Sequence, residues 1–184
     1  AQSIVFSAFG VAIGLAYDRT NGAIDRFRSL PMARGAVLTG YSLASLVRAL
    51  LPIVLMSICG LVIGWRIRTS LVDAVLAYAL MILFSFAMIW IGVLLGSILP
   101  SPEAVQGVAF VVLFPFTFIA STFVPVDTLP EPLRTLAEWN PTTALAEALR
   151  DLFGNPGVPS TGGDEPWSLV HPVAYTVLWV IGIV

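Results

Sequence analysis

The chain has 184 residues, of which 58% are hydrophobic and only 11% are charged, and its formal net charge is −2. Soluble domains carry about 25% charged residues, so this chain has too few charges to cover a globule of its size. Together with a mean hydropathy of +0.93, this excludes a soluble domain or enzyme. It predicts an all-α integral membrane protein with several spans, because apolar runs of about 20 residues cross a bilayer as helices.

The residue types absent from the chain exclude several kinds of chemistry. All nine basic residues are arginines, so no lysine is present for a nucleotide-binding P-loop or a Schiff base. The single cysteine, Cys59, and the single histidine, His171, cannot supply an intrachain disulfide or a Cys/His zinc site. We therefore predict no catalytic residues, no metal site and no cofactor on this chain.

Long apolar runs predict the positions of the membrane-spanning helices. None of these runs alternates apolar and polar residues as a membrane-spanning strand would. The first run looks like the end of a span and the last continues to the final residue, so we expect 1–184 to be one partial membrane domain of a longer protein. The predicted spans are about 1–17, 41–65, 71–99, 106–124 and 167–184.

The connections between these spans differ in charge, and the difference predicts their sidedness. Residues 18–34 contain four arginines and two aspartates, a net charge of +2, whereas 126–166 contain two arginines and seven acidic residues, a net charge of −5. Because short cytoplasmic loops carry an excess of basic residues, we expect 18–34 to be cytoplasmic and 125–166 to form an external hairpin. Arg66 and Arg68 argue weakly against this orientation, since alternation places them outside.

The cytoplasmic loop carries a short amphipathic helical pattern. Ile24, Phe27 and Leu30 recur every three residues and form one apolar stripe. Pro31 ends the helix, because the residue before a proline avoids helical geometry. Two interpretations remain open: a helix that lies on the lipid headgroups with its arginines held by anionic lipids, and a helix that docks a cytoplasmic partner.

Charges within the predicted spans are few, and aromatic residues are many. Arg48 lies about 10 Å from the cytoplasmic end of its span, counted from Tyr41 at about 1.5 Å per residue. It either snorkels or forms a structural pair, or it faces the bundle interior, where intramembrane charges are often functional. The aromatic residues suit an apolar substrate route, but lipid contact and helix packing explain most of them equally well. The candidate route residues are Arg48, Phe84, Phe110 and Phe114.

The external hairpin predicts two short helices that lie on or dip into the outer face. The first follows Pro130 and ends near Trp139, where Asn140 and Pro141 break the chain. Asn140 can cap the second helix, which has an apolar stripe and ends at Gly154. The hairpin residues that we single out are Pro125, Pro130, Trp139, Asn140, Pro141, Glu147 and Arg150.

Two of these segments resemble motifs of a known family. Residues 22–34 resemble the cytoplasmic loop of type-2 ABC-transporter permeases. Residues 123–130, 139–141 and 146–150 resemble the external hairpin that precedes the last span of that family. The similarity is greatest to the daunorubicin-resistance branch of bacterial drug-export permeases, and it extends from about the second span of the family into the sixth.

The resemblance implies the permease subunit of an ATP-driven exporter in the bacterial cell (inner) membrane. Two permease chains, as a homodimer or a heterodimer, would pair with ABC ATPase subunits that bind the ATP and magnesium. When the ATPases close, the cytoplasmic helix would move as a lever. The ATPase-docking residues that the resemblance implies are Gly22, Ile24, Asp25, Arg26, Phe27, Arg28, Leu30 and Pro31.

The scarcity of charge in the spans favours a lipophilic or amphipathic substrate, such as a drug, a lipid or a lipid-linked glycan. Besides the ATPase and the second permease chain we expect contact with the lipid bilayer and no nucleic acid. The alternatives are a membrane scaffold or sensor subunit without transport, and a secondary transporter. A secondary transporter would more usually carry charges or broken helices deep in its spans, and only Arg48 offers that here.

Overall fold

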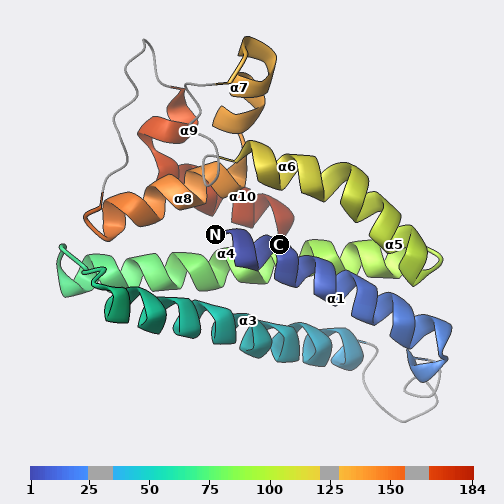
Figure 1. Ribbon diagram of the computed structural model, residues 1–184. Helices are drawn as coiled ribbons and strands as arrows, with labels where there is room; N and C mark the ends of the chain where they lie inside the picture. The colour runs from blue at the N-terminus through green and yellow to red at the C-terminus, as the bar shows by residue number, and fades with distance from the viewer. Residues whose placement is uncertain (25–34, 121–128, 156–165) are drawn as a thin grey trace.

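The computed structural model describes residues 1–24, 35–120, 129–155 and 166–184 (Figure 1). All regular secondary structure in these residues is helical, which confirms the prediction of an all-α chain. The elements are α1 (Gln2–Thr20), α3 (Ala36–Ile63), α4 (Leu71–Ile98), α5 (Pro102–Val108), the π-helix η1 (Ala109–Leu113), α6 (Phe114–Ile119), α7 (Glu131–Glu138), α8 (Pro141–Leu152), α9 (Trp167–Val170) and α10 (Pro172–Ile183).

Within the described residues, three stretches of helix are long and apolar enough to cross a membrane. They are Leu38–Ile63, Leu71–Ile98 and the composite α5–η1–α6 stretch Pro102–Ile119. Two of these helices begin at a serine N-cap. The side-chain oxygen of an N-cap residue accepts a hydrogen bond from a backbone N–H that has no partner within the helix. The hydroxyl oxygens of Ser70 and Ser101 accept hydrogen bonds from the backbone N–H groups of Asp73 and Ala104, each at 3.2 Å.

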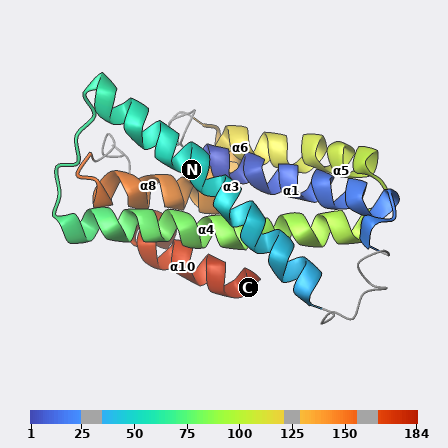
Figure 2. The ribbon, with the colours of Figure 1, turned by 90° about the horizontal axis from the view of Figure 1, so that it is seen from below.

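The bundle is centred on α4, and α1 packs most closely against it (Figure 2). Small residues line this contact, with Gly92 and Gly96 on α4 facing Ala8 and Ala12 on α1. A Cβ atom added at Gly92 would overlap the carbonyl oxygen of Ala8, and one added at Gly96 would overlap that of Ala12. Small residues spaced four apart let membrane helices approach to backbone contact, so α1 and α4 form a close-packed parallel pair.

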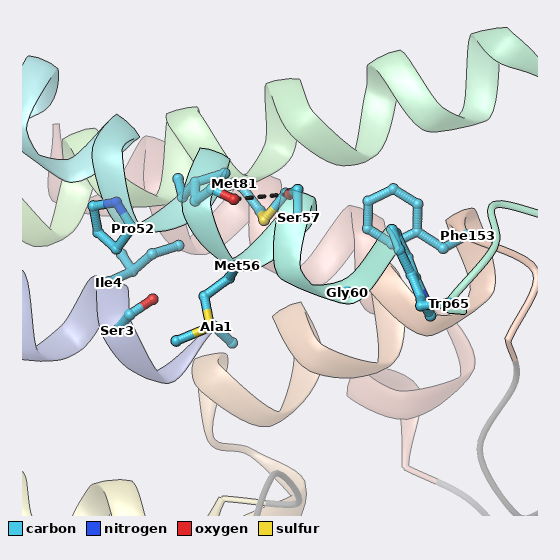
Figure 3. A pocket seen from close by; sticks show the side chains of 11 residues that line it. Ala1, Ser3, Ile4, Pro52, Met56, Ser57, Gly60, Trp65, Met81 and Phe153 are labelled. Carbon is cyan, nitrogen blue, oxygen red and sulfur yellow. Dashed lines mark hydrogen bonds between the residues drawn. The ribbon is translucent and has the colours of Figure 1, made fainter. Parts of the chain in front are cut away.

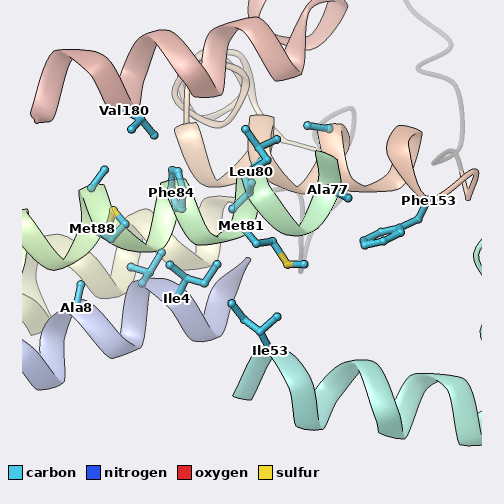
Figure 4. Packing of buried hydrophobic residues seen from close by; sticks show 14 residues of the cluster. Ile4, Ala8, Ile53, Ala77, Leu80, Met81, Phe84, Met88, Phe153 and Val180 are labelled. Atoms are coloured by element: carbon cyan, nitrogen blue, oxygen red, sulfur yellow. The ribbon is translucent and has the colours of Figure 1, made fainter. Parts of the chain in front are cut away.

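The main apolar core lies where α4 also meets α8 and α10 (Figure 4). Phe84 of α4 is fully buried there, together with Ile4 of α1, Leu145 of α8 and Val180 of α10. The helix α3 contributes only Ile53 to this cluster, and most of its other large apolar side chains are exposed. The helix α3 therefore lies at the edge of the bundle and exposes an apolar surface suited to lipid or to another protein chain.

Hydrogen bonds define two opposite ends of the bundle. At one end, the Arg19 guanidinium of α1 donates to the carbonyl oxygens of Gly96, at 3.2 Å, and of Ser97, both near the C-terminus of α4. At the other end, the backbone N–H of Arg68 donates to the carbonyl oxygen of Phe153 at 3.1 Å, which joins the α3–α4 loop to the end of α8. The end of α1 thus lies at the opposite end of the bundle from the α3–α4 loop and the end of α8. Which end faces the cytoplasm stays a prediction from the charges.

Candidate functional site

The segment predicted to dock an ATPase begins directly after α1. Gly22 has a φ of 70° in the left-handed region, which favours glycine, and its backbone N–H donates to the carbonyl oxygen of Arg19 at 3.1 Å. Ile24 is partly buried and packs against a small cluster that includes Leu15 of α1 and Ile89 of α4. The side chain of Ile24 thus already contacts the bundle. The other predicted docking residues, Asp25, Arg26, Phe27, Arg28, Leu30 and Pro31, lie outside the described residues.

Arg19 makes a contact at this end of the bundle that the sequence analysis did not predict. There, Arg19 was counted only toward the net charge of the loop. Its guanidinium donates to the carbonyl oxygens of Gly96, Ser97 and Leu99, which lie at the end of α4. The last carbonyls of a helix have no partner within the helix and attract a positive charge. Arg19 therefore fastens the end of α1, from which the predicted docking loop starts, to the end of α4. The signal in the sequence was an arginine in the last turn of a helix.

The structure does not bring all four predicted route residues together: Phe110 and Phe114 share a groove, whereas Phe84 and Arg48 lie elsewhere. Phe84 is fully buried, and its ring lies 6.5 Å from that of Trp179, so it is a core residue of the bundle. Arg48 lies on α3 with an exposed side chain. Because α3 begins at Ala36 and its apolar stretch at Leu38, Arg48 is about 15 Å from the start of that stretch. This distance along the helix is longer than the predicted 10 Å because it is counted from Leu38 rather than from Tyr41.

Phe110 and Phe114 lie together in an apolar groove between α1 and the α5–η1–α6 stretch. Their ring centroids are 6.1 Å apart, and Phe6 and Phe9 of α1 form the opposite wall. The groove has a volume of about 170 Å³ and its other lining residues are small or aliphatic, apart from Thr117. The sequence analysis missed Phe6 and Phe9 because they lie on the partial first span, where no pairing partner could be assigned.

The groove coincides with a local change of helix type. Residues 109–113 form the π-helix η1, and Pro115 follows directly in α6. Proline lacks the N–H that would complete the regular hydrogen-bond ladder, and π turns inside helices are frequent at functional sites. The irregular backbone therefore lies where the groove is lined by Phe110 and Phe114.

Asn140 is the central residue of the predicted external hairpin. It is 1% exposed and caps α8, because its Oδ1 accepts a hydrogen bond of 2.9 Å from the backbone N–H of Thr142. Its Nδ2 donates to the carbonyl oxygen of Phe116 in α6 at 2.7 Å. The cap was predicted, and Pro141 occupies the first turn of α8 as expected. The link to α6 was not predicted, since it joins residues 24 apart in the sequence.

The remaining hairpin residues that the structure describes are exposed or partly exposed. Trp139 is half exposed, and its carbonyl oxygen accepts a hydrogen bond of 2.7 Å from the Tyr175 hydroxyl of α10. Glu147 and Arg150 form an ion pair within α8 at 2.5 Å. Pro130 immediately precedes α7, and Pro125 lies outside the described residues.

A second link, at the opposite end of α8 from Asn140, escaped the sequence analysis. The Thr69 hydroxyl donates to the carbonyl oxygen of Leu152 at 2.6 Å, beside the backbone bond from Arg68 to Phe153. Gly154 follows with a φ of 67°, and a Cβ atom there would come within 2.8 Å of the Thr69 side chain. Nothing in the local sequence pattern indicated that the end of α8 packs on the α3–α4 loop.

Acidic, histidine and cysteine side chains do not gather at any of these places. Among the described residues, no group of three or more of them is placed to hold a metal ion. The features that the fold does bring together are the contact of Arg19 with the end of α4, the phenylalanine groove and the link from Asn140 to α6.

Comparisons with known proteins identify the family. The model of the family described as "ABC-2 type transporter" matches residues 1–153. The chain is 31% identical over 152 residues to the daunorubicin resistance ABC transporter permease protein DrrB1 of Streptomyces coeruleorubidus, covering 83% of this chain and 54% of that protein. It is 23% identical over 173 residues to the probable doxorubicin resistance ABC transporter permease protein DrrC of Mycobacterium tuberculosis strain CDC 1551 / Oshkosh, covering 94% of this chain and 58% of that protein.

No solved structure matches the chain significantly. The chain spans about half the length of the curated relatives that it matches. The family model covers most of the chain, including α1 to α6 and the hairpin as far as Phe153, and the helices are those of a multi-pass membrane protein. The chain therefore belongs to the ABC-2 type transporter family.

Proposed function

We propose that this chain is the membrane-spanning permease part of an ATP-driven exporter that moves a lipophilic or amphipathic molecule out of a bacterial cell. The ATPase is a separate subunit, which binds the ATP and magnesium, and a second permease chain completes the transporter. The membership of the ABC-2 type family supports this proposal, as do relatives named for daunorubicin and doxorubicin resistance.

The single observation that carries the cargo class is the phenylalanine groove. Phe6, Phe9, Phe110 and Phe114 surround a space that offers almost no polar surface. Aromatic rings bind flat or apolar molecules through stacking and buried area. A lipophilic cargo fits such a groove, whereas a small hydrophilic ion would lose its hydration there without compensation.

The packing of α1 supports a route for coupling. The helix α1 ends at the predicted docking loop and also forms one wall of the phenylalanine groove. Its contact with α4 is made backbone to backbone through Gly92 and Gly96, and Arg19 fixes the two helix ends. A displacement of the docking loop would therefore move α1 and α4 as one body, and the α1 wall of the groove would move with them.

Efflux of doxorubicin tests the proposal in cells that lack their own exporters and express the full-length protein with its ATPase. We expect Phe114→Ala to raise the retained fluorescence several-fold, because it removes one wall of the groove. Phe116→Ala is the matched control, since Phe116 is 37% exposed and does not line the groove. Equal efflux by both variants and the unchanged protein would contradict a cargo route through the groove.

The same assay separates the two alternatives. A secondary transporter would continue to export when the ATPase is inactivated and would stop when the ion gradient across the membrane is collapsed. A scaffold or sensor subunit would give no efflux under either condition. Efflux that requires an active ATPase supports the exporter.

A further inference from the structure

An aromatic pocket forms where α9 and α10 meet the turn between α7 and α8 (Figure 1). Two side-chain hydrogen bonds fix this junction. The Ser168 hydroxyl donates to the carbonyl oxygen of Glu138 at 2.6 Å, and the Tyr175 hydroxyl donates to that of Trp139 at 2.7 Å. The pocket has a volume of about 410 Å³, which is larger than that of the phenylalanine groove.

Three aromatic rings at one end of this pocket stand close to right angles. The Tyr175 ring lies 5.9 Å from the Trp139 ring, with an interplanar angle of 74°, and 6.2 Å from the Trp167 ring, with an angle of 75°. Trp139 is 50% exposed and Trp167 is 44% exposed, so part of each indole is open to a ligand. Because the Tyr175 hydroxyl already donates to Trp139, this end of the pocket offers mainly ring surfaces.

The other end of the pocket follows one side of α10. Leu178, Gly182 and Ile183 line it there, one to two turns beyond Tyr175 on the same face of the helix. Gly182 is about 10 Å further along α10 than Tyr175, and a Cβ atom added to it would meet no atom within 4 Å. The pocket is therefore elongated, with aromatic rings at one end and an open apolar strip at the other.

The rings and the charge of the surrounding sequence both favour a cation. The faces of tryptophan and tyrosine rings attract an ammonium group that lies within about 6 Å of the ring centroid, and the spacing of these rings lets one group reach more than one of them. Residues 126–166, which include Trp139, carry a net charge of −5, and 167–184 contain no arginine or lysine. Charge of one sign concentrates ions of the opposite sign nearby.

We propose that this aromatic pocket binds an amphipathic organic cation. The ammonium group lies against the rings of Trp139, Trp167 and Tyr175, and the apolar body extends along α10 toward Gly182. This proposal rests on the proposed exporter function, because it makes organic cations one class of the cargo and gives them a second binding place besides the phenylalanine groove.

The ion pairs of the hairpin distinguish such a cargo from a lipid headgroup. A phospholipid that carries an ammonium group also carries a phosphate next to it, and the phosphate needs a basic partner. Within the described parts of α7 to α10, the two arginines already pair with glutamates, Arg134 with Glu138 and Arg150 with Glu147. The pocket therefore suits a cation without an attached phosphate.

Photolabelling of the full-length protein in nanodiscs of phosphatidylglycerol, a lipid without an ammonium group, tests the site. The probes are benzyltrimethylammonium and neopentylbenzene with the same diazirine on the ring, so they differ only in whether N⁺ or carbon holds the three methyl groups. Labelling of Leu178 is divided by labelling of Val62, which is exposed on α3, to correct for unequal partition into lipid. We expect this ratio to be about tenfold higher for the ammonium probe, because cation–π contacts with several rings give a preference of that size.

Changes to the rings make the measurement specific. Trp167→Leu should remove most of the preference, whereas Trp167→Phe should keep part of it, since a phenylalanine ring attracts a cation less strongly than an indole. Trp65→Leu is the matched control and should keep the preference. Trp65 lines a separate cavity between α1, α3 and α4, where its ring lies edge to face with Phe153 at 4.9 Å (Figure 3).

Fluorination gives a second measurement that changes no residue. Growth on 5-fluorotryptophan keeps the shape of the indoles but withdraws electrons from their faces, so it should lower the preference for the ammonium probe. A purely apolar contact would not respond in this way.

Equal ratios for the two probes would overturn the proposal, as would a preference that survives either Trp167→Leu or fluorination, or one that Trp65→Leu removes equally. Labelling of Leu178 by a phosphocholine with the same diazirine, as strong as that by the ammonium probe, would assign the pocket to a lipid headgroup and overturn it as well. The labelling needs no ATP, whereas the efflux assay does. A pocket that binds no cation and a transporter that exports nothing are therefore separate results.

Discussion

Asn140 joins the start of α8 to the end of α6, and replacing its side chain tests how much the hairpin depends on this link. Asn140→Ala removes the cap on α8, which costs about 1 kcal/mol. It also leaves the carbonyl oxygen of Phe116 without its 2.7 Å donor, and an unpaired buried acceptor costs about 1–3 kcal/mol. Because Asn140 is 1% exposed, water cannot replace the lost donor, and the expected loss of unfolding free energy is about 2–4 kcal/mol.

Unfolding of the purified protein in mixed micelles, followed by circular dichroism against increasing SDS, measures this loss. Asn140→Ser should lose less unfolding free energy than Asn140→Ala, because a serine oxygen still caps α8. The serine side chain is too short to reach the carbonyl oxygen of Phe116. Thr135→Ala is the control, because the exposed Thr135 hydroxyl donates to the carbonyl oxygen of Glu131 within its own helix. It should change stability by about 0.5 kcal/mol or less. If Asn140→Ala behaved like Thr135→Ala, the reasoning about the shared cap would be refuted.

Three further changes probe other parts of the fold. Gly96→Ala places a methyl group against the carbonyl of Ala12 and should cost about 1–3 kcal/mol, whereas Gly107→Ala meets no atom within 4 Å and should be neutral in the same SDS titration. Gly154→Ala combines a φ of 67° with a contact to Thr69 and should cost about 1–2 kcal/mol; a cost no larger than that of Gly107→Ala would contradict the packing of α8 on the α3–α4 loop. Phe27→Ala should lower recovery of the ATPase in a pull-down about tenfold or more, since it removes a large apolar side chain from the predicted docking stripe. Arg26→Ala should lower that recovery less, and the reverse order would favour the lipid-surface interpretation.

Several features of the fold could be predicted because they depend on neighbouring residues. Apolar runs marked the long helices, and the hairpin helices were predicted from local signals, with Asn140 and Pro141 at the start of α8. Counting the spans predicted that successive loops alternate between the two ends of the bundle. In the structure, Arg19 at the end of α1 meets the end of α4, while Thr69 meets the end of α8 at the opposite end of the bundle.

The burial of individual apolar residues could not be predicted in this way. Phe84 and Phe110 look alike in the sequence, yet the first is fully buried and the second is 67% exposed. In a soluble protein the surface positions would be polar, and the pattern would reveal which face is buried. In a membrane both lipid and core are apolar, so hydrophobicity carries no such signal.

The sequence by itself determined that the chain is a helical membrane protein and that Asn140 caps the second helix of its hairpin. Only the tertiary structure decided that Gly92 and Gly96 meet Ala8 and Ala12, and that Phe6 and Phe9 face Phe110 and Phe114. Spans and caps arise from interactions within a few residues of the chain, which the sequence displays directly. Helix pairing in a membrane depends on shape and on backbone contact between distant segments, and these exist only once the helices have packed.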